Sequence, residues 1–360
     1  MAQADRQVMP EESVQVGPDV ASGVWFDDQS PSAPAAAGSV TYLDALTMAL
    51  DDELSSDDRV VLLGEDIGTM GGAFRVTRGL YEKYGASRVI DTPMAEAGLV
   101  GMAIGMAISG LRPIVELQFA DFISCAYDQL VNEAAKLHYR FGIAVPIVVR
   151  GPSGGGVGAG PFHSQSPEGI FSHVPGLKVV CPGTVQDAYS LLRLSVRDPN
   201  PVLFFEHKAL YRSLKGTLDR SKICLPIGRA EVRAEGDRLT IVTYGGLVRS
   251  CLEVAQTLAA EGIHVTVVDV RSLLPLDMET VMTSVKSTGR VLIVHEDTRT
   301  HGVGAEVAAH LAEASFFNLD APIVRLTAPD SPVPLSKPLE DAFIPQVAAI
   351  REAALRCLQT

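Results

Sequence analysis

The chain has 360 residues, of which 47% are hydrophobic and 20% are charged, and its formal net charge is −13. This composition excludes a wholly disordered chain, and the length predicts two or three domains with cores of their own. The acidic balance argues against a nucleic-acid partner and against an anionic membrane surface, because both select proteins with a basic face.

Two segments and the cysteines narrow the class of protein further. The longest apolar stretch, 97–111, contains four glycines and is too short to cross about 30 Å of hydrocarbon. The N-terminus shows no basic region followed by an apolar core, so we expect no secretory signal. The odd number of cysteines, without any CxxC pair, predicts reduced buried thiols in a cytoplasmic protein rather than disulfides or a zinc site. These cysteines are at positions 125, 181, 224, 251 and 357.

The N-terminal half begins with residues 1–38, whose Pro-, Ala- and Ser-rich end predicts a disordered tail. From Thr41, a possible N-cap, apolar residues recur at helical spacing over 41–54. Short apolar runs then alternate with helical patterns, which predicts a parallel sheet covered on both faces. The expected strands are 59–64, 88–90, 113–117, 146–149, 177–180 and 202–205, and the further helices are 95–109, 123–140 and 185–196.

The segment 213–228 mixes charge, Gly and Pro, and this pattern predicts a linker. A second alternation follows, with expected strands at 239–244, 263–269, 290–294 and 322–326 and helices at 247–260, 277–286 and 303–314. The sequence therefore predicts an α/β fold with two doubly wound domains, 39–212 and the smaller 229–360. No repeat of 20–50 residues indicates a solenoid or propeller.

Ligands of open α/β sheets bind outside the carboxyl ends of the strands, and three segments there are unusually polar or Gly-rich. These segments are 64–72, 91–98 and 150–167. The Gly-rich part, 151–160, has neither the GxxxxGK[ST] nor the GxGxxG pattern, so it does not predict a phosphate site. We interpret it as a mobile loop at the mouth of a channel.

Glu96 opens the predicted apolar helix that follows the strand at 88–90. A carboxylate there often only stabilises the helix dipole. However, apolar neighbours and a buried helix predict a partly desolvated carboxyl with a raised pKa, suited to proton donation near neutral pH. Gly98, Gly101 and Gly105 would let another helix approach closely.

His163, among small polar residues in FHSQS, is the best candidate for an acid–base histidine, and a histidine merely bonded within the loop is an equal alternative. The remaining histidines considered have no pair with metal-ligand spacing and are treated as structural. These are His138, His173, His207, His295 and His301. HExxH does not occur and no nucleophile is evident, and an enzyme without its own nucleophile or metal usually depends on a cofactor.

Several longer motifs occur together, in order and at regular spacing, from about Thr41 to the C-terminus. They are DTPMAEAGLVGMAIGMA, LRPIVELQFADF, DQLVNEAAKLHYRFG, FHSQSPE, PGLKVVCPGTVQDA, DPNPVLFFEHKALYR and VDVRSLLPLD. Through this set of motifs the chain resembles the β subunit of the E1 component of 2-oxo acid dehydrogenase complexes. IVELQFADF, HSQSPE and FFEHKALYR look most like the branched-chain member, while the pyruvate and acetoin members remain open.

The resemblance implies an N-terminal pyrimidine-binding domain, a C-terminal transketolase-like domain and an α2β2 heterotetramer with an E1 α subunit. It implies thiamine diphosphate at the α–β interface, with the diphosphate and Mg²⁺ held by the α subunit through a GDG…N motif. Because this chain has no GDG, it would hold only the aminopyrimidine half and would be inactive alone. The implied reaction decarboxylates a 2-oxo acid, a branched-chain one by the motifs above, and acylates the lipoyl group of the E2 acyltransferase. A non-catalytic assembly subunit of the same fold is the alternative from another class.

The resemblance also implies roles for individual residues. Glu96 matches the glutamate that bonds the aminopyrimidine ring nitrogen, and Phe122 matches the residue packed on that ring, often tyrosine in branched-chain relatives. His163 matches a histidine at the lipoyl channel, and Glu65 matches a carboxylate at the inner end of the cofactor pocket. Some members bind K⁺ through backbone carbonyls, and the matching positions are Val145, Ile147, Val148, Ser195, Asp198 and Asn200.

Overall fold

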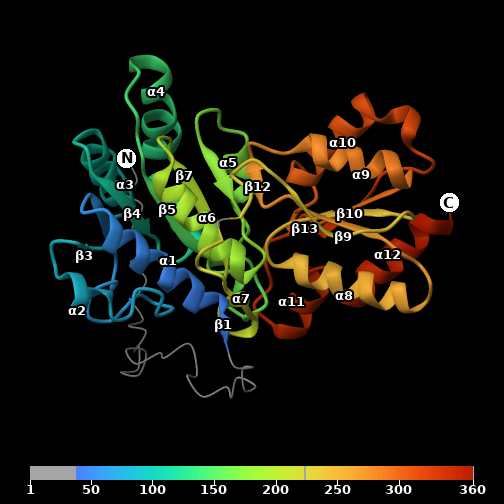
Figure 1. Ribbon diagram of the computed structural model, residues 1–360, viewed down its shortest axis with the longest axis horizontal. Helices are drawn as coiled ribbons and strands as arrows, with labels where there is room; N and C mark the ends of the chain where they lie inside the picture. Colours follow the sequence, from blue (N-terminus) through green and yellow to red (C-terminus); the bar gives the residue numbers. More distant parts are fainter. Residues whose placement is uncertain (1–37, 223, 360) are drawn as a thin grey trace, which may run out of the picture. The chain divides into compact units, whose positions relative to one another are not determined.

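The computed structural model describes residues 38–222 and 224–359, so the predicted tail lies outside the described residues except for Gly38. The described chain forms two main sheets with helices against them (Figure 1). No helix in this part is long and apolar enough to cross a membrane.

The larger sheet has the strand order β12-β6-β7-β5-β4-β2-β3, and every strand except β12 runs parallel to its neighbours. Its six parallel strands confirm the six apolar runs predicted in the N-terminal half. They are β2 (Val60–Gly64), β3 (Val89–Asp91), β4 (Arg112–Glu116), β5 (Val148–Ser153), β6 (Lys178–Val180) and β7 (Val202–His207). Strands β2 and β5 are buried along their whole length, as expected for a sheet covered on both faces.

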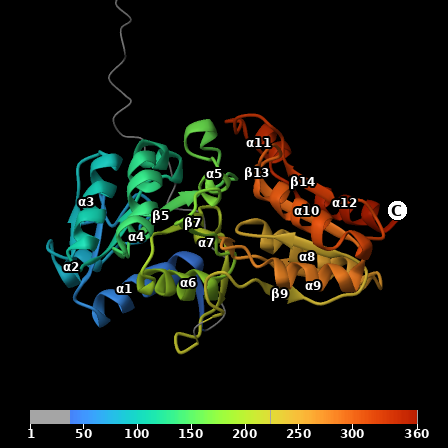
Figure 2. The same ribbon diagram turned by 90° about the horizontal axis from the view of Figure 1, so that it is seen from above.

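Helices cover the two faces of this sheet (Figure 2). On one face α1 (Tyr42–Ser56) packs against α6 (Val185–Arg197). Thr41 caps α1 as predicted, because its hydroxyl accepts the N–H of Asp44 at 3.0 Å while the Asp44 carboxylate accepts the N–H of Thr41.

The other face of the larger sheet is covered by α3 (Glu96–Ile108), the 3₁₀ helix η1 (Ala120–Ala126), the π-helical turn η2 (Gln129–Ala134) and α4 (Ala135–Phe141). The helix expected at 123–140 is therefore three shorter helical pieces. Short helices complete this half: α2 (Leu80–Tyr84), η3 (Gly160–Phe162), α5 (Glu168–Ser172) and α7 (Leu210–Ser213).

Helix α3 is buried on one face only, so the prediction of a buried helix is wrong for its other face. Leu99 and Ile104 belong to the core, whereas Met102 and Ile108 are 41% and 48% exposed. A C-β atom at Gly105 would meet nothing within 4 Å. Helix α3 thus has one apolar side packed in the core and another apolar side exposed to solvent.

The smaller sheet has the strand order β14-β13-β10-β11-β9, and only β9 runs antiparallel to its neighbour. Helices α8 and α12 contact one face of it, and α9 and α10 contact the other (Figure 1). The pattern analysis predicts neither β9 nor the last two helices. The strands are β9 (Glu231–Ala234), β10 (Thr240–Thr243), β11 (Thr266–Asp269), β13 (Val291–Thr298) and β14 (Val324–Ala328). The helices are α8 (Leu247–Ala260), α9 (Met278–Thr288), α10 (Val303–Ala314), η4 (Phe316–Asn318), α11 (Lys337–Phe343) and α12 (Val347–Gln359).

One strand from the C-terminal half joins the larger sheet. Strand β12 (Ser272–Leu274) pairs antiparallel with β6, so the chain returns to the first sheet before it builds α9. Nearby, the fully buried Arg271 donates through its Nε to Asp187 of α6 at 3.0 Å. The two sheets are therefore joined by backbone pairing as well as by packed side chains.

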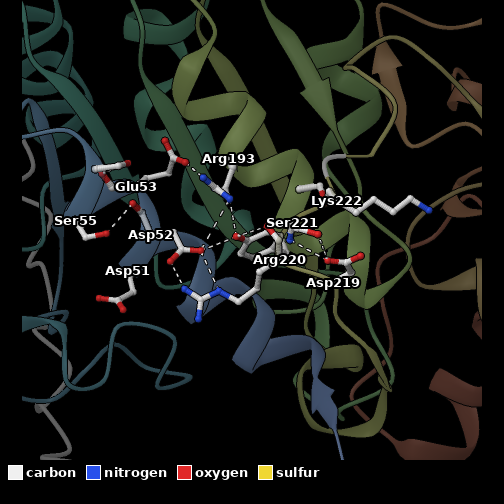
Figure 3. Close-up of polar contacts among 12 residues, drawn as sticks. Asp51, Asp52, Glu53, Ser55, Arg193, Asp219, Arg220, Ser221 and Lys222 are labelled. Carbon is white, nitrogen blue, oxygen red and sulfur yellow. Dashed lines mark hydrogen bonds and ion pairs between the residues drawn. The ribbon is translucent and has the colours of Figure 1, made fainter.

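The segment predicted as a linker, 213–228, contains ordered structure. Its strand β8 (Lys215–Thr217) pairs antiparallel with β1 (Ser39–Thr41). Arg220 forms an ion pair with Asp52 of α1 (Figure 3). The segment is thus held against the first sheet's helices.

The same network joins α1 to α6. Glu53, only 2% exposed, accepts hydrogen bonds at 2.7 Å from Arg193 and from Arg197 (Figure 3 labels Glu53 and Arg193). A carboxylate this deeply buried requires such partners, because an uncompensated charge would be strongly destabilising. The ion pairs therefore fix the register of α1 on α6.

The five thiols are free. Three of them are buried and Cys224 is half-buried, but Cys125 in η1 is exposed, so the prediction of buried thiols is wrong there. Cys125 lies on the outer side of the 3₁₀ helix η1, next to the exposed Ser124.

Candidate active site

Two of the predicted carboxylates follow neighbouring parallel strands. Glu65 comes directly after β2, and Glu96 begins α3, which follows β3. Glu65 is 8% exposed and Glu96 is half-buried. Burial raises the pKa of the Glu65 carboxyl, and the nearby carboxylates of Glu96 and Asp66 raise it further. The structure therefore brings Glu65 and Glu96 within electrostatic reach of each other at one edge of the sheet.

An aromatic cluster lies after the next strands. Phe119 and Phe122 belong to the turn and 3₁₀ helix that follow β4, and His163 follows the Gly-rich loop after β5. The His163 ring centroid is 4.5 Å from that of Phe119 and 5.6 Å from that of Phe122, and both contacts are edge-to-face. The structure thus brings the two predicted residues, Phe122 and His163, together.

Hydrogen bonds connect the segments that carry these residues. The side chain of Gln118 donates to the Asp66 carboxylate at 3.1 Å, which ties the end of β4 to the segment after β2. The N–H of Gln165 donates to the Asp121 carboxylate at 3.0 Å, which ties the His163 segment to η1. The carboxylates and the aromatic cluster therefore lie on adjoining segments at the carboxyl edge of one sheet.

A buried ion cluster supports this edge, and the pattern analysis missed it. Arg150 of β5 donates through Nε to Glu206 of β7 at 2.6 Å, and it also pairs with Glu116 of β4. Tyr211 donates to the same Glu206 carboxylate at 2.6 Å. Burial opposes the charged form of Arg150, but the carboxylates of Glu206 and Glu116 hold its pKa above the usual value. The signal was present in the sequence, because charged residues interrupt three neighbouring apolar strands: Glu116 ends β4, Arg150 lies within β5 and Glu206 is next to last in β7.

The six positions expected to hold K⁺ come from two segments that touch each other: the loop before β5 with the first residue of that strand, and the end of α6 with the loop after it. The N–H of Val145 donates to the carbonyl of Pro199 at 3.1 Å, and the N–H of Val202 donates to the carbonyl of Ile147 at 2.9 Å. The Asp198 carboxylate forms an ion pair with Lys178. Residues 38–222 and 224–359 contain no cluster of three His, Cys, Asp or Glu side chains that could hold a metal ion. A cation here would depend on backbone carbonyls, three of which, those of Val145, Ile147 and Ser195, already accept hydrogen bonds.

Comparisons with known proteins identify the family of this chain. Residues 38–213 match the family "Transketolase, pyrimidine binding domain", and residues 228–350 match "Transketolase, C-terminal domain". The chain is 48% identical over 320 residues to the 2-oxoisovalerate dehydrogenase subunit beta of Bacillus subtilis, covering 88% of this chain and 98% of that relative. It belongs to the family of E1 β subunits of 2-oxo acid dehydrogenase complexes.

Other E1 β relatives are nearly as similar. The chain is 42% identical over 334 residues to the mitochondrial pyruvate dehydrogenase E1 subunit beta-2 of Oryza sativa, covering 91% of this chain and 89% of the relative. It is 43% identical over 327 residues to the acetoin:2,6-dichlorophenolindophenol oxidoreductase subunit beta of Cupriavidus necator, with 88% and 96% covered. The solved structure of a split-gene transketolase, described as an inactive β4 tetramer, superposes with a TM-score of 0.73 at 23% identity, covering 89% of this chain and 98% of that one. That structure supports the two-domain fold.

E1 β subunits of this family contribute to a thiamine diphosphate site together with an α subunit. The residues of this chain fit the aminopyrimidine half of that cofactor. Phe122 offers a partly exposed ring beside His163, and Glu96 offers a half-buried carboxylate whose charge acts on Glu65. A flat heteroaromatic ring with a hydrogen-bonding edge needs both an aromatic surface and a carboxyl partner.

Proposed function

We propose that this E1 β subunit acts on a branched-chain 2-oxo acid: with its α subunit it decarboxylates the acid and reductively acylates the lipoyl group of E2. The support is the 48% identity to a 2-oxoisovalerate dehydrogenase subunit beta over nearly its whole length, against 39–43% for pyruvate and acetoin relatives. A pyruvate- or acetoin-type subunit is the second candidate, and it is favoured by Phe122, where branched-chain relatives often carry tyrosine.

In this proposal Glu96 holds a proton at the ring nitrogen of the aminopyrimidine. Bound thiamine diphosphate supplies the electron sink for decarboxylation. A glutamate is required at position 96, since aspartate would be one methylene shorter and glutamine could bond the ring but not exchange the proton. Phe122 orients the ring by packing on it. In this proposal Glu65, whose pKa is raised by burial and by the Glu96 carboxylate, relays protons to and from the cofactor site.

His163 would act at the mouth of the site. Its ring edge packs on Phe119 and Phe122, so the imidazole is held beside the proposed aminopyrimidine surface. From there it can stabilise a developing charge or guide the incoming lipoyl group.

We also propose that K⁺ binds the carbonyls of the six matched positions, between the loop before β5 and the end of α6. A cation there would tie these loops together and raise the melting temperature. The expected result is a higher melting temperature in KCl than in NaCl of equal ionic strength. Equal melting temperatures in the two salts would contradict K⁺ binding.

The decisive experiment combines this chain with its α subunit, thiamine diphosphate and Mg²⁺ and follows decarboxylation of the 2-oxo acid. Glu96→Gln should lower kcat by about 10²–10⁴-fold, the range for loss of a positioned acid–base group. Glu82→Gln is the matched control, because Glu82 is an exposed glutamate in the first turn of α2. Unchanged kcat in Glu96→Gln would favour a non-catalytic assembly subunit.

The substrate class is tested with the same complex. The proposal expects a higher kcat/KM for 3-methyl-2-oxobutanoate than for pyruvate. The reverse order would assign the chain to the pyruvate type while leaving the role of Glu96 intact.

A further inference from the structure

The Gly-rich loop that carries His163 cannot fix its own conformation with side chains. Between β5 and η3, four glycines adopt positive φ angles: Gly154 at +77°, Gly156 at +87°, Gly158 at +72° and Gly160 at +70°. Glycine adopts positive φ angles readily, but it also has many other conformations available, so its own sequence does not select this one. Whatever orders this loop must therefore act on its main chain.

Two carboxylates from the C-terminal half bind that main chain. Glu340 of α11 accepts the N–H of Gly156 at 2.9 Å and the N–H of Gly158 at 3.0 Å. Glu296 of β13 accepts the N–H of Gly155. Three of the loop's amides are thus held from outside by two carboxyl groups.

Glu340 is fully buried, with 0% exposure, although it lies on a short helix near the end of the chain. A carboxylate in that position is destabilising unless hydrogen bonds or a cation compensate its charge. The loop amides supply the hydrogen bonds. The buried Lys208, whose charge interacts with Glu340, donates to the carbonyl of Gly154 at the start of the same loop. The buried carboxylate of Glu340 is therefore stabilised by hydrogen bonds from the amides of the loop.

The path from these amides to His163 is short. Gly160 packs closely on Leu335, and the N–H of His163 donates to the carbonyl of Gly160 at 3.3 Å. A shift of the main chain at Gly158 is therefore transmitted within five residues to the imidazole. The edge-to-face contact of that imidazole with Phe119, at 4.5 Å, would change with it.

We infer that Glu340 is a positioning residue: it anchors the Gly-rich loop through the amides of Gly156 and Gly158 and so sets the place of His163. This inference rests on the proposed role of His163 and extends the site to a residue in the C-terminal half. Glu340 touches neither substrate nor cofactor in this account. Its effect passes through the loop alone.

The test uses the assembled E1 with its α subunit and compares Glu340→Gln with Asp341→Asn. Glutamine keeps the size of the side chain but replaces one acceptor oxygen with an NH₂ group that faces amide donors. Asp341 is the neighbouring, partly exposed residue, and its carboxylate pairs with Lys337 on the same helix rather than with the loop. Glu340→Asp, which keeps the charge and shortens its reach by one methylene, is the second variant in case the glutamine variant does not fold.

Two readouts are expected to change together. Amide hydrogen exchange in peptides covering 154–162 should become about tenfold faster or more in Glu340→Gln, because a bond that protects these amides is lost. The kcat should fall about ten- to hundredfold, as expected when a reacting group is displaced, while KM for the 2-oxo acid stays within about twofold. Asp341→Asn should change neither, and Glu340→Asp should lie between the wild type and the glutamine variant.

The decisive comparison is the double variant with His163→Ala. If Glu340 acts through His163, adding Glu340→Gln to His163→Ala should lower kcat no further. Losses that multiply, or unchanged exchange in 154–162, would overturn the inference. If the wild-type complex showed no activity on any 2-oxo acid, the proposed function would fail, while unchanged or faster exchange would still decide whether Glu340 anchors the loop.

Discussion

Glu168, the first residue of α5, is a buried acid whose titration should be visible in the stability of the protein. Its side chain is 4% exposed, and burial raises its pKa to about 8, with the carboxylates of Asp297 and Glu296 adding to the effect. The hydroxyl of Tyr244 interacts with the Glu168 carboxyl, and both residues line the same small cavity of about 20 Å³. We therefore expect the folded protein to keep Glu168 protonated at neutral pH.

The sign of the pH dependence follows from the raised pKa. Between about pH 4.5 and pH 8 the folded state keeps this proton and the unfolded chain does not, so raising the pH within that window lowers the free energy of unfolding. From pH 6 to pH 8 the loss from this one group is about 2 kcal/mol. Glu168→Gln replaces the neutral acid with a neutral amide of the same size and removes this loss. The variant should thus gain about 2 kcal/mol relative to the wild type over the same interval.

Urea unfolding of both proteins at several pH values between 6 and 8 measures this difference directly. Taking the difference between variant and wild type cancels other titrating groups, such as Asp269, whose pKa burial raises to about 7. Glu133→Gln, at an exposed position in η2, is the control and should show no pH-dependent difference. A constant difference between Glu168→Gln and the wild type across this range would refute the reasoning.

Three further substitutions test the packing that supports the site, each by urea unfolding. Arg150→Met leaves the buried Glu116 and Glu206 carboxylates without their cation, so it should lower the free energy of unfolding by about 3–5 kcal/mol. A decrease below about 1 kcal/mol would contradict the ion cluster. Gly176→Ala places a side chain at a φ of +99° and against a neighbouring backbone carbonyl. We therefore expect the free energy of unfolding to fall by about 3 kcal/mol or more, and an unchanged value would refute this close approach. Thr184→Ala removes the N-cap of α6 and should cost about 1 kcal/mol, whereas Thr184→Ser should restore most of it.

The strands of the larger sheet could be predicted because parallel strands buried on both faces are continuous apolar runs, as in β2 and β7. Helices α8 and α10 follow their predicted ranges for a similar reason, since an apolar stripe at helical spacing marks each of them. The antiparallel strands β9 and β12 could not be found this way. Each is only three or four residues long, and its partner is distant in the sequence.

Glu96 could be singled out from the sequence because it opens an apolar helix, and His163 because it lies among small polar residues just after the Gly-rich segment. The structure brings Glu96 close to Glu65, and His163 close to Phe122. Glu340 gave no such signal, because a glutamate on a short, largely polar helix is expected to be solvated. Only the tertiary structure shows that its carboxylate is buried under a loop almost two hundred positions earlier.

The pairing of β12 with β6 bears on how this chain can be divided. A fragment ending near residue 228 would contain all six parallel strands of the larger sheet but would leave β6 with an open edge. An uncovered edge strand of this kind is a template for pairing with other chains, so the isolated N-terminal half should aggregate unless residues 272–274 are supplied. Expression of the two halves as separate polypeptides would thus require the second to complete the first by strand addition, and the natural single chain guarantees that this strand is always present.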